Sequence, residues 1–177
     1  MNSLWYNIVL HSVGFLGIIA SILSFQCRKH KPLILFRSAN EILFAIQYAM
    51  LGAYTGMAMN LIGTVRNLIF ADMVEKNKNT TPIRILFSVL FLIFVGFTWS
   101  GVKSVMFGFG KVVTTFAYGS SKTSVVRIMT FFTSCTFFVY NLMVKSYAGC
   151  ICEFFTLCSI IVGIIRLDVL KLQEKAA

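Results

Sequence analysis

Seven long apolar segments divide this chain and leave only short connections between them. A helix needs about 17 to 25 mainly apolar residues to cross about 30 Å of hydrocarbon. Hydrophobic residues make up 58% of the 177 residues and charged residues only 12%, an excess that the core of a water-soluble domain does not need. The chain is therefore expected to be an all-α polytopic membrane protein. Its predicted transmembrane helices cover residues 7–26, 33–51, 57–74, 84–100, 105–119, 128–144 and 149–166.

The seven segments follow a three, one, three arrangement, which predicts two copies of one small unit. The second half can be laid on the first at an offset of 93 residues. An odd linking helix lets both copies keep the same orientation in the membrane. The matching positions are Gly17 with Gly110, Lys29 with Lys122, Phe44 with Phe137, Tyr54 with Tyr147, Gly56 with Gly149, and Asn60 with Glu153.

The predicted duplication sets the domain boundaries. A first triple-helix bundle covers residues 1–74, a loop and linking helix cover 75–104, and a second triple-helix bundle with a cytoplasmic tail covers 105–177. Tight connections at 52–56 and 145–149 leave few residues outside the bilayer. We therefore expect the function to be carried out within or across the membrane.

The formal net charge of +10 comes from lysines and arginines near the ends of the apolar segments. Nearly all of them flank the first, third and fifth connections or the C-terminal tail, whereas Lys103 and Lys145 lie on the other side. By the positive-inside rule, the N-terminus is expected outside and the C-terminus in the cytoplasm. Arg66 and Arg166 are interpreted as topology anchors at cytoplasmic helix ends. Topology thus accounts for the charge without a nucleic-acid partner.

The motifs of soluble enzymes do not occur in this sequence. It has no glycine-rich phosphate loop, no nucleophile elbow and no metal-spaced histidines. His11 and His30 stand at opposite ends of the first segment, too far apart to share a metal. The five cysteines are interpreted as reduced apolar residues. We therefore predict no enzymatic activity, no catalytic residue, no metal and no cofactor.

Polar side chains inside the predicted spans are the candidate functional residues, because burial in a bilayer is costly and such residues face the bundle interior. Arg37 and Glu41 are four residues apart on one helix face, so a pair between them is the structural interpretation of Glu41, and a functional role is the alternative. Interhelical hydrogen bonding, worth on the order of 1 kcal/mol or less per bond, is the alternative interpretation of Asn40, Gln47 and Ser159.

Asn60 and Glu153 occupy equivalent positions in the two proposed copies, four residues after Gly56 and Gly149. If the copies are related by an axis along the membrane normal, the two side chains converge near that axis. The predicted substrate-binding residues are Asn40, Asn60, Asn141 and Glu153. The candidate proton or ion sites are Glu41 and Glu153.

The stretch from Asn40 to Gly56, followed by Asn60 and Arg66 to Phe70, resembles the YgjV-type bacterial inner membrane proteins. The later positions that fit the same pattern are Tyr140, Asn141, Gly149, Glu153, Ser159 and Arg166. The resemblance covers most of the chain. It implies a multi-pass protein of the bacterial inner membrane, and it implies no particular activity.

More distantly, the three, one, three plan with an outside N-terminus resembles the SWEET and SemiSWEET sugar transporters. In those proteins an asparagine on the third helix of each bundle lines the sugar pocket, which would correspond to Asn60 and Glu153 here. This chain departs by carrying an acid in the second copy. A second departure concerns the prolines, which SWEET-type bundles carry within helices as hinges. Here Pro32 and Pro82 lie at or beside loops.

Two functions are compatible with these observations. The first is transport of a small polar, sugar-like solute through a central cavity between two parallel repeats. The alternative is a non-transporting membrane scaffold or accessory protein, in which the same polar residues join helix to helix. The expected partners are membrane lipid and a small polar solute, and an oligomer is compatible with the sequence.

Overall fold

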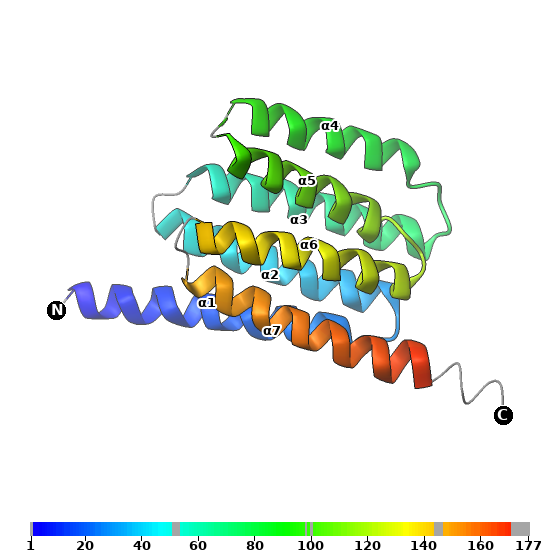
Figure 1. Cartoon of the computed structure of the whole chain (residues 1–177), viewed down its shortest axis with the longest axis horizontal. Helices are drawn as coiled ribbons and strands as arrows, with labels where there is room; N and C mark the ends of the chain where they lie inside the picture. The colour runs from blue at the N-terminus through cyan, green and yellow to red at the C-terminus, as the bar shows by residue number, and fades with distance from the viewer. Residues whose placement is uncertain (1, 51–53, 98, 100, 144–146, 171–177) are drawn as a thin grey trace.

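The computed structural model describes residues 2–50, 54–97, 99, 101–143 and 147–170, which form seven helices (Figure 1). The helices agree with the predicted spans to within a few residues at most ends, so the all-helical membrane fold is confirmed. Their bounds are α1 (Asn2–Gln26), α2 (His30–Met50), α3 (Tyr54–Glu75), α4 (Thr81–Phe97), α5 (Val102–Tyr118), α6 (Thr123–Met143) and α7 (Tyr147–Ile164), which continues as a π-helical turn, Ile165–Val169.

Local sequence explains several of the helix ends. Pro32 and Pro82 lie in the first turns of α2 and α4, where a backbone N–H would have no partner within the helix. Between α3 and α4, Asn77 adopts a positive φ of 52°, a conformation that asparagine tolerates better than most residues. Asn79 lies just before α4, and its Oδ1 accepts a hydrogen bond from the backbone N–H of Thr81, the first residue of the helix, at 3.0 Å.

The helices pack as two groups of three with α4 at one edge (Figure 1). In the first group α2 contacts both α1 and α3, and in the second α6 contacts both α5 and α7. The groups meet where α1 packs against α7 and where α3 contacts α5. Helix α4 packs mainly against α5.

The outer surface of the bundle is apolar. Exposed side chains include Phe15, Leu92, Phe132 and Phe154, each more than half exposed. By length and hydropathy, the segments Leu4–Gln26, Thr123–Met143 and Gly149–Val169 can each cross a membrane, and Thr81–Phe97 is a shorter apolar helix. Helices α2, α3 and α5 carry charged side chains that the bundle buries. Large exposed apolar area of this kind suits contact with lipid rather than water.

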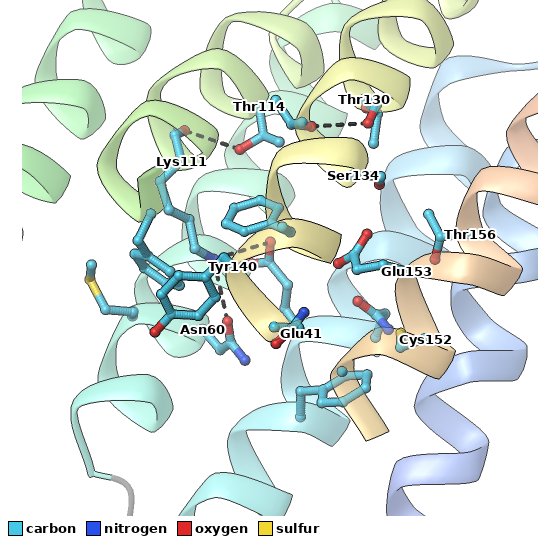
Figure 2. A pocket seen from close by; sticks show the side chains of 18 of the residues that line it. Glu41, Asn60, Lys111, Thr114, Thr130, Ser134, Tyr140, Cys152, Glu153 and Thr156 are labelled. Atoms are coloured by element: carbon cyan, nitrogen blue, oxygen red, sulfur yellow. Dashed lines mark hydrogen bonds and ion pairs between the residues drawn. The ribbon is translucent and has the colours of Figure 1, made fainter. Parts of the chain in front are cut away.

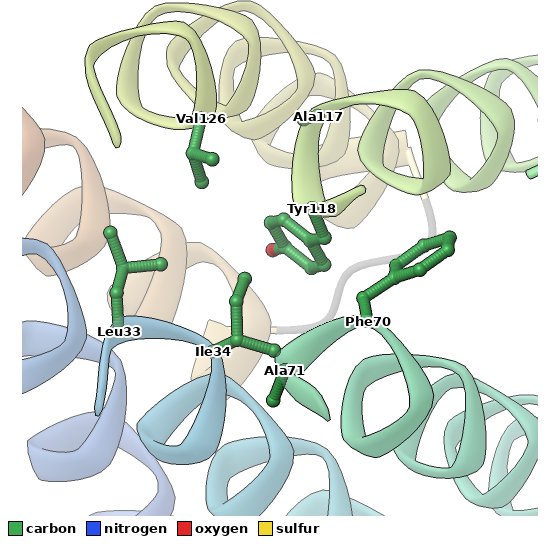
Figure 3. Close-up of a cluster of buried hydrophobic side chains, with 7 residues drawn as sticks. All are labelled: Leu33, Ile34, Phe70, Ala71, Ala117, Tyr118 and Val126. Atoms are coloured by element: carbon green, nitrogen blue, oxygen red, sulfur yellow. The ribbon is translucent and has the colours of Figure 1, made fainter. Parts of the chain in front are cut away.

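One end of the bundle is closed by a cluster of buried hydrophobic side chains, which we call the apolar seal (Figure 3). It lies where α2 and α6 begin and where α3 and α5 end. Its side chains are no more than 3% exposed, so water does not reach their surfaces. The members of the apolar seal are Leu33, Ile34, Phe70, Ala71, Ala117, Tyr118 and Val126.

Candidate functional site

A cavity of about 460 Å³, lined by many polar side chains as well as by apolar ones, lies inside the bundle and is partly open. Its walls come from both groups of three helices, with a contribution from Val95 of α4. The polar or charged side chains that line it are Arg37, Asn40, Glu41, Tyr48, Asn60, Lys103, Ser104, Lys111, Thr114, Thr130, Thr133, Ser134, Tyr140, Asn141, Glu153 and Thr156.

The cavity reaches the end of the bundle opposite the apolar seal. Lys103 in the first turn of α5, Asn141 in the last turn of α6 and Gly149 in the first turn of α7 line it at that end. At its other end, the lining residue Arg37 contacts Tyr118, a member of the apolar seal. The cavity, which we call the chamber, therefore reaches one end of the bundle, and its inner end lies next to the apolar seal.

All of the predicted site residues line this cavity. Asn40 and Glu41 come from α2, and Asn60, Asn141 and Glu153 come from α3, α6 and α7 respectively. The structure thus brings together residues up to 113 positions apart in the chain. Whether these side chains bind a substrate stays a prediction.

Some of the polar residues also join helices. Asn40 Nδ2 donates a hydrogen bond to the backbone oxygen of Gly17 at 2.8 Å, and the Ser159 hydroxyl donates to the backbone oxygen of Ile22 at 2.7 Å. Gln47 Nε2 makes a longer contact of 3.5 Å with the backbone oxygen of Leu10. The alternative interpretation of Asn40, Gln47 and Ser159 as interhelical contacts therefore agrees with the geometry.

Glu41 does not pair with Arg37, contrary to the prediction from their spacing. Its Oε1 lies 3.2 Å from Arg66 Nη2 on α3 and 4.0 Å from Lys111 Nζ on α5. Arg37 instead donates to the Tyr118 hydroxyl at 2.9 Å and to Ser21 Oγ at 2.8 Å. The i, i+4 spacing rule considers only residues of one helix. It predicted the wrong partner for Glu41 because, inside a bundle, charged groups on neighbouring helices also compete for each side chain.

Arg66 is not a topology anchor at a helix end. Its side chain is 0% exposed, and it donates to Thr115 Oγ1 at 2.9 Å in addition to its ion pair with Glu41. The guanidinium also lies 5.3 Å from the Phe91 ring centroid and 5.1 Å from that of Tyr118, within the range of cation–π attraction. Arg66 is therefore a buried charge that joins α3 to α2 and α5.

Lys111 is a functional candidate that the sequence analysis missed. It is 7% exposed, and its Nζ donates to Asn60 Oδ1 at 3.3 Å besides approaching Glu41 (Figure 2). Three helices thus meet at one ammonium group. The signal was present in the sequence, because a lysine in the middle of an apolar span is costly unless it has a partner or a purpose.

Arg127 is one of the basic residues that flank the fifth connection in the sequence, and the structure buries it as well. It is 0% exposed and donates to the backbone oxygens of Phe25 at 3.1 Å and Cys27 at 2.6 Å. Its Nη1 also pairs with Asp168 Oδ1 at 2.8 Å. These bonds satisfy carbonyls at the end of α1, which an ending helix leaves without partners, and they tie α1 to α6.

Glu153 faces the cavity from the first turns of α7 (Figure 2). Figure 2 shows the polar side chains of Ser134 of α6 and Thr156 of α7 beside it. Thr156 shares a hydrogen bond of 2.7 Å with Ser21 of α1. Glu153 therefore lies where α6 and α7 face the interior of the bundle.

Comparison with known proteins identifies a family. No curated protein and no solved structure matches the chain, and the distant likeness to SWEET proteins stays a prediction. A family model described as bacterial inner membrane protein, Imp-YgjV, matches residues 8–171. The match covers every helix that lines the cavity. The chain belongs to the Imp-YgjV family of bacterial inner membrane proteins.

Proposed function

We propose that this protein is a carrier that moves a small polar solute across the inner membrane through the central cavity. The observation that carries the proposal is a chamber lined by polar and charged side chains, inside a bundle whose outer surface is apolar. Polar groups are expensive inside a membrane and are usually found where they line a path or a binding site. A chamber of about 460 Å³ is large enough for a small organic molecule.

The position of the apolar seal supports a carrier rather than an open channel. The chamber reaches one end of the bundle, and buried hydrophobic side chains close the other end. A carrier needs this property, because its binding site must be reachable from only one side at a time. With the N-terminus outside and the C-terminus in the cytoplasm, as the charge distribution predicts, this conformation faces outward.

Contacts repeated between the two halves support two parallel copies around the chamber. A β-carbon on Gly17 would lie 2.9 Å from Phe44 Cε2, and one on Gly110 would overlap the ring of Phe137. The two glycines are 93 positions apart in the chain, and so are the two phenylalanines. Rocking of two such units against each other is a known route to alternating access.

In this proposal the binding side chains are Asn40, Asn60, Asn141 and Glu153. Glu41 and Glu153 are the candidate proton or ion sites, since both line the chamber and carboxyl groups inside membrane bundles commonly serve proton-coupled transport. Asn60 is the most informative of these residues to change, because its amide receives a hydrogen bond from Lys111 and does not bond a neighbouring helix backbone in the contacts described here.

Uptake into proteoliposomes tests the proposal. Vesicles with the purified protein are compared with protein-free vesicles for labelled sugars, amino acids and small carboxylates. The wild type should accumulate at least one solute class, and Asn60→Ala should reduce that uptake without a matching fall in melting temperature. Asn7→Ala, at an exposed position of α1, is the matched control and should leave uptake unchanged.

The opposite result would favour the scaffold. In that case no solute enters faster than into protein-free vesicles, and Asn60→Ala lowers only the melting temperature. The polar residues would then serve helix packing, and the search would move to partner proteins.

A further inference from the structure

We propose that the solute is a small organic anion, whose carboxylate binds between Arg37 and Lys111. This inference rests on the proposed carrier function and specifies its substrate class. It replaces a neutral sugar with a charged molecule. The argument comes from the balance of charge around the chamber.

The charged side chains that line the chamber carry a positive excess. Three are cations, Arg37, Lys103 and Lys111, and two are carboxylates, Glu41 and Glu153. Glu41 is also the ion-pair partner of Arg66, which lies behind the chamber wall and is fully buried. Counting Arg66, four cations face two carboxylates.

Lys111 is only weakly compensated. Its distance to Glu41 Oε1 is 4.0 Å, whereas Arg66 Nη2 holds the same oxygen at 3.2 Å. The shorter contact of Lys111 is with the neutral amide oxygen of Asn60 at 3.3 Å. One carboxylate thus serves two buried cations, and a buried cation without its own anion is unfavourable in a membrane interior.

Arg37 is held by neutral groups. In the described part of the chain, its hydrogen bonds go to the Tyr118 hydroxyl and to Ser21 Oγ. Its guanidinium lies 5.5 Å from the ring centroid of Phe25 and 5.8 Å from that of Tyr118. Glu41 and Glu153 both act electrostatically on Arg37 and on Lys111, but in the described part of the chain neither carboxylate forms an ion pair with Arg37.

An anion that enters the chamber would supply the missing charge. A guanidinium recognises a carboxylate by two parallel hydrogen bonds, and an ammonium adds a third as a point charge. A neutral sugar would leave the excess in place. The charge pattern therefore selects against neutral polar solutes and against cations.

The aromatic lining defines the rest of the ligand. Phe107 lies 5.7 Å from Phe137 and 5.8 Å from Tyr140 between ring centroids, and all three line the chamber. Lys111 Nζ is 5.7 Å from the Phe107 centroid. The cationic group thus adjoins an apolar wall, which fits a carboxylate attached to a short hydrocarbon or aromatic skeleton.

Binding to the purified protein tests this inference separately from transport. The probes are propionate, succinate and benzoate, each beside its neutral amide, with glucose and inorganic phosphate as further compounds. The melting temperature of the wild type should rise with at least one carboxylate and not with its amide. Inorganic phosphate, which lacks a carbon skeleton, should bind more weakly than the best carboxylate.

Two variants locate the site. Lys111→Met and Arg37→Gln should each weaken the apparent affinity for the carboxylate by about tenfold or more, as expected for loss of a charge-assisted contact. Lys78→Met, an exposed lysine between α3 and α4, is the matched control and should bind like the wild type. If one variant does not give a monodisperse protein, the other variant and the comparison of carboxylate with amide still test the location of the site.

The outcomes distinguish this inference from the proposed function. Equal shifts with carboxylate and amide, a shift with glucose alone, or no shift at all would overturn the anion site. Carboxylate binding that both variants retain would overturn its location. Carboxylate binding without uptake into proteoliposomes would keep the anion site and refute the carrier, whereas sugar uptake without carboxylate binding would do the reverse.

Discussion

Glu41 shows what a single residue contributes to this bundle. It is 6% exposed, it bonds Arg66, and it lies within reach of Lys111. Its second oxygen, Oε2, is buried and has no hydrogen-bond partner among the described residues. The backbone at Gly63 comes so close to this carboxylate that a β-carbon would overlap it. One acid therefore holds α2, α3 and α5 together.

Glu41→Gln should destabilise the protein strongly. Removing one partner from a buried ion pair leaves an uncompensated charge and costs about 3 to 5 kcal/mol, here because Arg66 and Lys111 both lose their anion. Thermal unfolding in detergent measures the effect. The exposed pair of Lys31 and Glu75 offers the control, since both side chains are about half exposed and Glu75→Gln should change stability little. Equal effects of the two variants would contradict the buried role of Glu41.

The sequence predicts which residues line the chamber through one rule: polar side chains within apolar spans face the interior of the bundle. That rule found Asn40, Asn60, Asn141 and Glu153, all of which line the cavity. Their partners were not predictable, because a spacing of four residues describes only one helix, while the actual bonds cross between helices. The same limit explains the wrong pair of Arg37 with Glu41.

At the scale of the elements, glycines set how closely helices approach. The ring of Phe137 from α6 packs against Gly110 of α5. In the same way, the ring of Phe44 from α2 packs against Gly17 of α1. The helices themselves followed from runs of apolar residues, so their number and approximate bounds could be predicted. Their neighbours could not, because apolar segments carry little information about which face meets which helix.

Gly110→Ala should loosen the contact of α5 with α6. The added methyl group needs the space that Phe137 fills, and overpacking of this kind costs about 1 to 3 kcal/mol. Gly96→Ala in α4 is the matched control, because nothing lies within 4 Å of its added carbon; there the better helix propensity of alanine should leave stability equal or slightly higher.

Melting temperatures of the two glycine variants decide this point. A second change, Phe137→Leu in the Gly110→Ala background, should recover part of the loss by making room for the methyl group. If Gly110→Ala and Gly96→Ala melt alike, the glycine contact does not determine helix spacing.

At the scale of the whole molecule, the chamber and the apolar seal lie toward opposite ends of the bundle. The chamber reaches the end where α5 and α7 begin, and the apolar seal occupies the end where α2 and α6 begin. The distribution of lysine and arginine predicts which end faces the cytoplasm. Together these features predict that the chamber faces outward.

Thiol labelling tests this orientation. In a variant without the native cysteines, Lys103→Cys at the open end of the chamber should react with a membrane-impermeant maleimide in intact spheroplasts. Lys78→Cys, between α3 and α4, should react only after the membrane is broken, because it lies at the sealed end. The reverse pattern would show that the chamber faces the cytoplasm and that the charge rule fails for this chain.

Arg37 lies between Phe25 of α1 and Tyr118 of α5, so one guanidinium spans the two groups of helices. The same guanidinium lines the chamber and bonds a tyrosine of the seal. An anion bound there would compete with the Tyr118 hydroxyl for its donors. If the proposed carrier function holds, the bond between Arg37 and Tyr118 would hold the seal in place while the chamber is empty. A solute that replaces this bond would release the seal, so a single guanidinium would govern both leakage and selectivity.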